Sequence, residues 1–336
     1  GTITSANGGI DGGTWSVTVS SIDAEAKNNI TIGTGLTIDN SESTDKVVSF
    51  ISRLGSFDSE MIELTGGALE IAAANDVRIN EFTAINYERI AISALSDSAG
   101  YVTYDHEADA TSGGMITGGT WSIKNTLLND TFVTAYADIE IDTSISLDHV
   151  KLDLASTTGG FTAQAVNVTN GSDLNVRTAT DIAIEHLSGK NSRIYMTSMH
   201  NYGRSVNSRT DATGGGRLVA SSVELISCDT EVITFGDIVI SEKLEASEDE
   251  DDPDPDPSLC MLMSVAGGFT LVDGAAETFL HVTDSEFAVY VATDIAADHV
   301  IVTDSNATFT ALADAYGHSV VSIDSAVGGG DFNAKT

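Results

Sequence analysis

Three Asp-His neighbours are the residues of this sequence best suited to proton transfer, which needs an acid and a base within reach of one substrate. Adjacent residues of a β-strand point to opposite faces, so none of these pairs forms a dyad by itself. Two of them stand in similar contexts, LDHVKL and ADHVIV, which indicates structural repetition. Two facing carboxylates would serve glycoside hydrolysis, but among 50 acidic residues the sequence singles out no pair. We therefore predict no enzyme and no catalytic residue among Asp105-His106, Asp148-His149 and Asp298-His299.

Metal binding is suggested by one acidic tract, SEDEDDPDPDPS, which begins at Ser247. The spaced motifs of zinc sites and of EF-hands are absent from the sequence. Calcium prefers hard oxygen ligands, so the tract is a calcium candidate, and we expect the protein to require no other cofactor. The candidate ligands are Asp249, Asp251, Asp252, Asp254 and Asp256.

The two cysteines, Cys228 and Cys260, form a disulfide candidate. In an oxidising compartment the bond would close a loop of about 32 residues and stabilise the fold by roughly 3.5–4 kcal/mol. Two free buried thiols are the alternative.

The net charge of −35 restricts the partners of this protein. Such a surface repels nucleic-acid phosphates and anionic lipid headgroups, so we predict neither as a partner. It attracts cations, and it also fits a solubility coat for a saline environment.

The location follows from composition. No stretch approaches the ~20 apolar residues of a membrane helix, so we expect no membrane insertion. The chain opens on the polar GTITSANGGIDGG, which indicates either a cytoplasmic protein or a processed N-terminus. Abundant Ser and Thr and scarce Lys favour the second. We therefore predict an extracellular or cell-surface protein after signal-peptide removal.

A Gly-Gly step followed by a short strand pattern recurs about every 50 residues, which is the mark of a repeat protein. A second element, an acidic residue followed by alternating aliphatic residues, lies downstream of most steps, as in ANDVRINEF, ATDIAIEHL and FGDIVISEKL. Period-2 alternation predicts strands. Two steps share the tetrapeptide GGTW, whose Trp15 and Trp121 we expect to pack between coils, with sugar stacking as the alternative. The steps are Gly12-Gly13, Gly66-Gly67, Gly118-Gly119, Gly159-Gly160, Gly215-Gly216 and Gly267-Gly268.

These patterns predict an all-β parallel β-helix of about six repeats, each of about 50 residues and two coils. In its recurring Gly-Gly steps and short strand patterns, the chain resembles the right-handed β-helix proteins of bacterial surfaces and phage tailspikes. Tandem β-sandwich domains are the alternative, because they also give short strands at regular spacing. Sandwich loops would be expected to contain many prolines, but all 3 lie between positions 253 and 257.

We predict a single elongated domain, 1–336, with two insertions of opposite charge: a basic one at 188–217 and an acidic one at 245–260. Equivalent positions of successive repeats stack, so the two are expected to pair within the chain. Pairing with a neighbouring subunit is the alternative, and it would set register more than affinity. The assembly candidates are Lys190, Arg193, Arg204, Arg209, Glu248 and Glu250.

Both ends of the sequence read as strand and glycine turn rather than as a cap, and uncapped coils favour head-to-tail self-association, which yields filaments. We therefore predict a secreted structural subunit of an extracellular filament, sheath or surface layer. An adhesin or tailspike-like protein that binds glycans is the alternative. A β-helix polysaccharide lyase or hydrolase is the less favoured third possibility.

Overall fold

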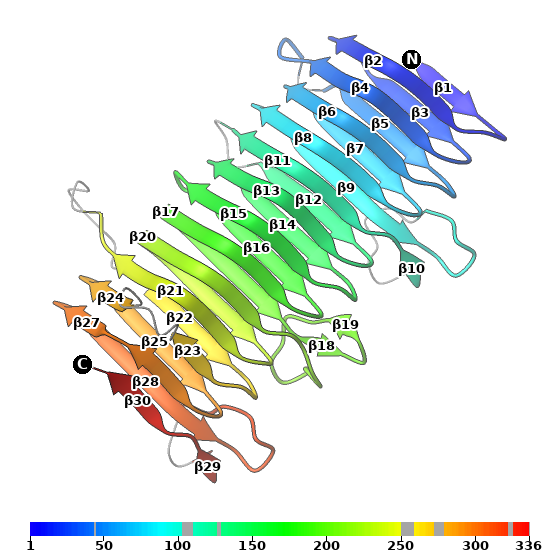
Figure 1. The fold of residues 1–336 in the computed structure, drawn as a ribbon. Helices are drawn as coiled ribbons and strands as arrows, with labels where there is room; N and C mark the ends of the chain where they lie inside the picture. Colours follow the sequence, from blue (N-terminus) through cyan, green and yellow to red (C-terminus); the bar gives the residue numbers. More distant parts are fainter. Residues whose placement is uncertain are drawn as a thin grey trace. The chain divides into compact units, whose positions relative to one another are not determined.

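The computed structural model describes residues 1–336 except 44, 103–109, 126–128, 250–258, 272–278, 322–324 and 336. The chain divides into two units, Gly1–Ala163 and Gln164–Thr336. In each unit successive strands stack in parallel, as the fold class predicted (Figure 1). These parallel ladders exclude antiparallel sandwiches. Among the described residues no helix is long and apolar enough to cross a membrane.

The first unit alternates long and short strands, so that each coil contributes one of each. Its long strands are β2 (Ile10–Thr18), β4 (Ile30–Asp39), β6 (Phe57–Thr65), β8 (Val77–Ile85), β11 (Ile116–Lys124) and β13 (Ile139–Asp148). Its short strands are β1 (Thr2–Ser5), β3 (Ile22–Ala26), β5 (Val47–Ser52), β7 (Ala68–Ala73), β9 (Arg89–Ser96), β12 (Asp130–Ala135) and β14 (Lys151–Ser156), with the two-residue β10 (Ser112–Gly113) beside β9. Strand β15 (Phe161–Thr169) spans the boundary between the units.

The second unit keeps the alternation but joins or splits some strands. Strands β17 (Ile182–Ser198) and β20 (Leu218–Thr234) each run through a whole coil, and the others are β16 (Asp173–Thr178), β18 (His200–Asn201), β19 (Arg204–Ser205), β21 (Ile238–Ser247), β22 (Leu259–Ser264), β23 (Phe269–Leu271), β24 (Phe279–Thr283), β25 (Glu286–Val291), β26 (Ile295–Asp298), β27 (Val300–Thr303), β28 (Asn306–Ala313), β29 (Gly328–Gly329) and β30 (Phe332–Lys335).

The core lies inside the coils because every second residue of a strand points inward. Equivalent inward residues stack in register from coil to coil, and most of the buried ones are apolar. One such column has side chains that are at most 1% exposed: Ile30, Phe57, Val77, Ile116 and Ile139. In-register apolar columns therefore join the coils.

The corner between a long and a short strand is closed by a residue with positive φ. Asn and Asp tolerate this conformation better than most residues, and they are frequent here. The corner residues include Val19, Asn86, His149, Asn170, Asn191, Ser227, Asp284 and Asp304. At most of these corners a residue with a short polar side chain thus adopts the positive φ that glycine commonly adopts in turns.

The acidic and basic insertions are shorter than their sequence boundaries suggested. Residues 188–198 belong to β17, so the extra segment of that coil is 199–217. Residues 245–247 belong to β21, and residues 259 and 260 to β22. The strand pattern continues into both charged stretches because their inward positions remain apolar or small.

Candidate functional sites

An aspartate clasp joins every second coil to the next. In each case a side-chain oxygen of the residue just before one long strand accepts a hydrogen bond from the backbone N–H just before the next, at 2.7–3.0 Å. The acceptor and donor residues are Asn29 and Ser56, Asp76 and Met115, Asp138 and Gly160, Asp181 and Arg217, Asp237 and Gly268, and Asp294 and Asp331. The acidic residue of the second sequence element is therefore the acceptor of the clasp.

Glycine is required next to the clasp because the two coils approach closely. A Cβ on the residue before each donor would collide with the acceptor residue or its neighbour. These glycines are Gly55, Gly114, Gly159, Gly216, Gly267 and Gly330. The acidic element of one coil and a glycine of the next coil therefore form one contact. This contact recurs every two coils, which matches the two-coil repeat of the sequence.

The doubled glycines nevertheless occupy more than one kind of position. Gly66 and Gly67, with φ of 69° and 65°, make the corner after β6. Gly12 and Gly118 lie within long strands, where a Cβ would collide with the indole Nε1 of the tryptophan three residues on. The recurring Gly-Gly steps of the sequence therefore occupy different places in the coil.

The two GGTW tetrapeptides have the same local geometry but different environments. In both, the register with the following long strand shifts beside the glycines. Trp121 is 0% exposed and donates a hydrogen bond from Nε1 to the carbonyl of Ile79 at 3.0 Å. Trp15, in the first long strand, is only partly covered and packs on Phe50. Trp121 therefore packs in the core as predicted, whereas Trp15 does so only in part.

The first and last coils expose residues whose equivalents one coil inward are fully buried. Ile3 is 41% exposed and pairs with Ala24, which is 0% exposed. At the other end, Val302 is 41% exposed and pairs with Val282, which is 0% exposed. Phe332 is 50% exposed and stacks on Phe309 at 5.2 Å between ring centroids. Inward-facing apolar residues are therefore accessible on the end coils of this chain.

The predicted contact between the acidic and the basic segments forms within the chain. Lys190 Nζ lies 2.9 Å from Asp249 Oδ2, and the Asp249 side chain is 13% exposed. The backbone N–H of Asp249 donates to Ser227 Oγ at 2.8 Å. Glu248 forms no ion pair with another described residue, and the remaining acidic candidates, Glu250, Asp251, Asp252, Asp254 and Asp256, lie outside the described part of the chain.

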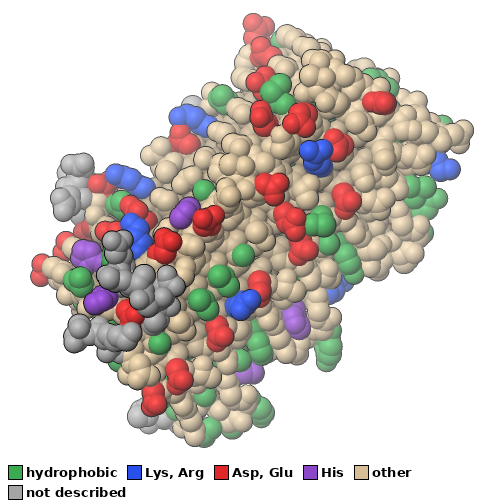
Figure 2. All heavy atoms as spheres, viewed as in Figure 1, with side chains coloured by type: hydrophobic (Ala, Val, Ile, Leu, Met, Phe, Trp, Pro, Cys, Tyr) green, Lys and Arg blue, Asp and Glu red, His purple; other side chains and the backbone are tan. Residues whose placement is uncertain are grey.

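The basic candidates make further contacts inside the second unit. Arg193 forms a bidentate pair with Asp173 on the neighbouring strand, with both N···O distances 2.7 Å. Arg209 lies 2.9 Å from the sulfur of Met263, and Arg204 is in the hairpin strand β19. Figure 2 shows acidic side chains spread over the visible face with few basic ones, which fits the net charge.

The segment 199–217 packs back on the outside of the short strands instead of projecting into solvent. Met199 and Ala212 from this segment form a buried cluster with Ile233, Met263 and Val265 of the coils. The sequence pattern alone does not predict this second apolar cluster. Its only sequence signal is that Ile233 and Met263 occupy outward strand positions, where polar residues are usual.

No candidate metal centre is found among the described residues: no three of their His, Cys, Asp and Glu side chains converge. The predicted calcium ligands beyond Asp249 are outside that part of the chain. Calcium binding therefore stays a prediction.

The two cysteines are free thiols instead of the predicted disulfide. Cys260 pairs in register with Thr230, two residues beyond Cys228. That offset, about 6.6 Å along the strand and about 4.8 Å between strands, exceeds the reach of a relaxed disulfide. Burial raises the pKa of Cys228 to about 11 and that of Cys260 to about 12.

The Asp-His neighbours occupy structural positions where the structure describes them. His149 is a corner residue, and His299, with φ of 47°, separates β26 from β27. Asp148 pairs with Lys124, and Asp298 is buried. Asp105 and His106 lie outside the described residues.

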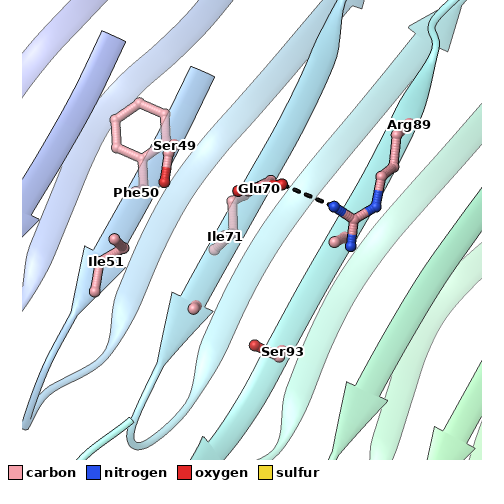
Figure 3. A pocket seen from close by; sticks show the side chains of 9 residues that line it. Ser49, Phe50, Ile51, Glu70, Ile71, Arg89 and Ser93 are labelled. Atoms are coloured by element: carbon pink, nitrogen blue, oxygen red, sulfur yellow. Dashed lines mark hydrogen bonds and ion pairs between the residues drawn. The ribbon is translucent and has the colours of Figure 1, made fainter. Parts of the chain in front are cut away.

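A shallow pocket lies on the outer side of the short strands β5, β7 and β9 (Figure 3). Small side chains, Ala72, Ala91 and Ser93, leave the hollow, and the Glu70–Arg89 ion pair, at 2.9 Å, borders it. The two charged side chains that line it, Glu70 and Arg89, are paired with each other. The pocket therefore gives no reason to assign a reaction.

Comparison with protein-family models, with curated proteins and with solved structures finds no match for this chain. The β-solenoid class rests on the fold itself.

Proposed function

We propose that this protein is a structural β-solenoid subunit that assembles end to end into an extracellular filament, sheath or surface layer. The observation that carries the proposal is the apolar core layer of the first and last described coils, which presents Ile3 and Trp15 on one and Val302 and Phe332 on the other to whichever coil lies next. Apolar surface of this kind gains about 25 cal/mol per Å² when buried.

The partner that fits these end coils is another coil of the same kind. Strands β1 and β2 pair with β3 and β4 in parallel, and the described residues provide no strand on their other side. A parallel coil from a second copy would continue both ladders and both apolar columns. Such a head-to-tail contact does not close on itself and therefore generates a filament.

The extracellular location belongs to this proposal and is supported by composition alone. Ser and Thr are abundant and Lys is scarce. The unbonded cysteines add no support, because their free state fits a reducing compartment equally well.

The test compares two tryptophans in the same tetrapeptide. Negative-stain microscopy and sedimentation velocity of the purified chain should show fibres or ordered sheets. Trp15→Ser should give discrete particles with a nearly unchanged melting temperature. Trp121→Ser, the matched control, should lower the free energy of unfolding by about 3–5 kcal/mol because it empties a fully buried site. Monomers of the unmodified chain at high protein concentration, or fibres that survive Trp15→Ser, would contradict the proposal.

A further inference from the structure

Three segments follow a short strand and precede the next long strand. They come after β9, β17 and β28, and the structure describes residues 97–102 and 110–115 of the first, 199–217 of the second, and 314–321 and 325–331 of the third. The first and third begin with the same turn: the backbone N–H of Asp97 bonds the carbonyl of Tyr101, and that of Asp314 bonds the carbonyl of His318. In both turns the aspartate Oδ1 accepts two further backbone N–H groups. Insertions at one corner of a solenoid commonly form its binding face.

Each of these segments exposes a tyrosine beside a glycine of positive φ. Tyr101 is 49% exposed, Tyr202 90% and Tyr316 85%. The neighbouring glycines, Gly100, Gly203 and Gly317, have φ of 79°, 81° and 80°. Side chains so exposed contribute little to packing, so the fold does not explain why tyrosine recurs at these tips.

Tyr202 is costly for the backbone. It is the first residue of the two-residue loop between β18 and β19, with φ of 50°, and Gly203 follows. Loops of this type strongly prefer Asn-Gly, because both residues need positive φ. A bulky residue at such a position is an outlier, and outliers that the fold does not need cluster at functional positions.

The surroundings of the tips in the second unit are polar and aromatic. Tyr316 lies 6.5 Å from the ring of His318, and His318 lies 5.9 Å from the ring of Phe235. The pKa of Asp314 is lowered chiefly by the backbone hydrogen bond from His318, with smaller contributions that include the charge of Arg209 in the neighbouring insertion. The two insertions of this unit are therefore close enough to interact electrostatically.

We propose that the insertion tips bind neutral glycan chains, with each exposed tyrosine stacking on one sugar ring. The negative face of an aromatic ring attracts the C–H groups of a pyranose, and tyrosine supplies this area at little cost in entropy. The two tips of the second unit, Tyr202 and Tyr316, suit a ligand with repeating units, because linked weak contacts add up.

Two magnitudes favour this ligand over others. The net charge of −35 repels polyanions. A protein partner needs about 800 Å² of continuous surface per side, whereas each separate tip offers one tyrosine of at most about 250 Å². Glycan binding and end-to-end assembly are tested separately, because the first is measured on the insertion tyrosines and the second on Trp15 in the first long strand.

The test uses the fluorescently labelled chain on an array of neutral gluco-, manno-, xylo-, galacto- and N-acetylglucosamine oligosaccharides. We expect binding to at least one series, weakened about three- to tenfold by Tyr202→Asn or Tyr316→Asn and abolished when Tyr101→Asn is added to both. Tyr202→Asn installs the residue that the turn prefers, so its melting temperature should stay the same or rise while binding falls. Tyr202→Phe should retain binding.

Ile85→Asn is the matched control, because Ile85 is an exposed apolar residue, 39% accessible, on a long strand and away from the insertions. It should bind like the unmodified chain. Absence of binding to every series, or full binding by the triple asparagine variant, would overturn the proposal. Either result would leave end-to-end assembly, which is measured by sedimentation, unaffected.

Discussion

The carboxylate of Asp76 accepts a hydrogen bond from the backbone N–H of Met115 at 2.9 Å, although 39 positions separate the two residues in the chain. The contact fixes where one coil begins relative to the next. The contact recurs on every second coil. The two-coil repeat of the sequence is therefore explained by this hydrogen-bonded clasp as well as by the apolar columns.

Removing the clasp acceptor should destabilise the fold, and replacing it by an amide should not. Asp76→Ala leaves the N–H of Met115 without its partner, which we expect to lower the free energy of unfolding by about 1–2 kcal/mol. Asp76→Asn keeps an oxygen acceptor, as Asn29 does at the equivalent place. Urea unfolding of the two variants measures the difference. Equal midpoints for both would show that the clasp has no energetic role.

The GGTW geometry predicts opposite outcomes for two glycines. Gly118→Ala places a Cβ against the indole of Trp121, so we expect a loss of about 1–3 kcal/mol in unfolding free energy. Gly13→Ala meets nothing within 4 Å, so stability should be unchanged or slightly higher. Thermal unfolding followed by circular dichroism compares them. A harmless Gly118→Ala would mean that the indole has room to move.

The buried thiols should make stability depend on alkaline pH. Their pKa values in the folded chain, about 11 for Cys228 and about 12 for Cys260, lie above the ordinary value of 9.0. Folding then favours the protonated thiols. This contribution is complete below pH 9 and is lost as the pH rises through 11 to 12.

The measurement is the difference in urea midpoint between the unmodified chain and the Cys228→Ala/Cys260→Ala variant, taken at pH 8 and at pH 10.5. The difference should shrink at the higher pH, and both native thiols should resist iodoacetamide at pH 8 because the thiolate is the reactive form. Rapid alkylation of the folded chain at pH 8 would contradict the assignment.

Salt should stabilise the protein overall while weakening one local contact. Screening of a net charge of −35 relieves self-repulsion, so the melting temperature should rise between 10 mM and 500 mM NaCl, concentrations that span most of the screening range. Asp249→Asn removes the partner of Lys190 and should cost at most about 1 kcal/mol, less at high salt. CaCl2 at matched ionic strength tests the acidic tract: a larger rise than with NaCl would support a calcium site there.

Much of the fold was predictable from local pattern. Alternating residues such as those of DIVISEKL form strands wherever one face is buried, and the acidic element and the glycine steps repeat because the coil repeats. A contact between the basic and the acidic segments was also predicted, but not which residues would meet, Lys190 and Asp249. The cysteine pair was predicted wrongly, since an offset of two residues between neighbouring strands cannot be read from one sequence.

Strand-forming coils with an acidic surface could be predicted from local pattern alone, because period-2 burial and composition are local properties. The fold was needed to show which glycine makes a corner, lies beside a clasp or accommodates a tryptophan, and why Trp121 is buried while Trp15, in the same tetrapeptide, is partly exposed. The reason is physical: burial, close approach and ion pairing depend on which coil lies next to a residue. Which coil lies next to a given residue depends in turn on the insertions of varied length between the strands.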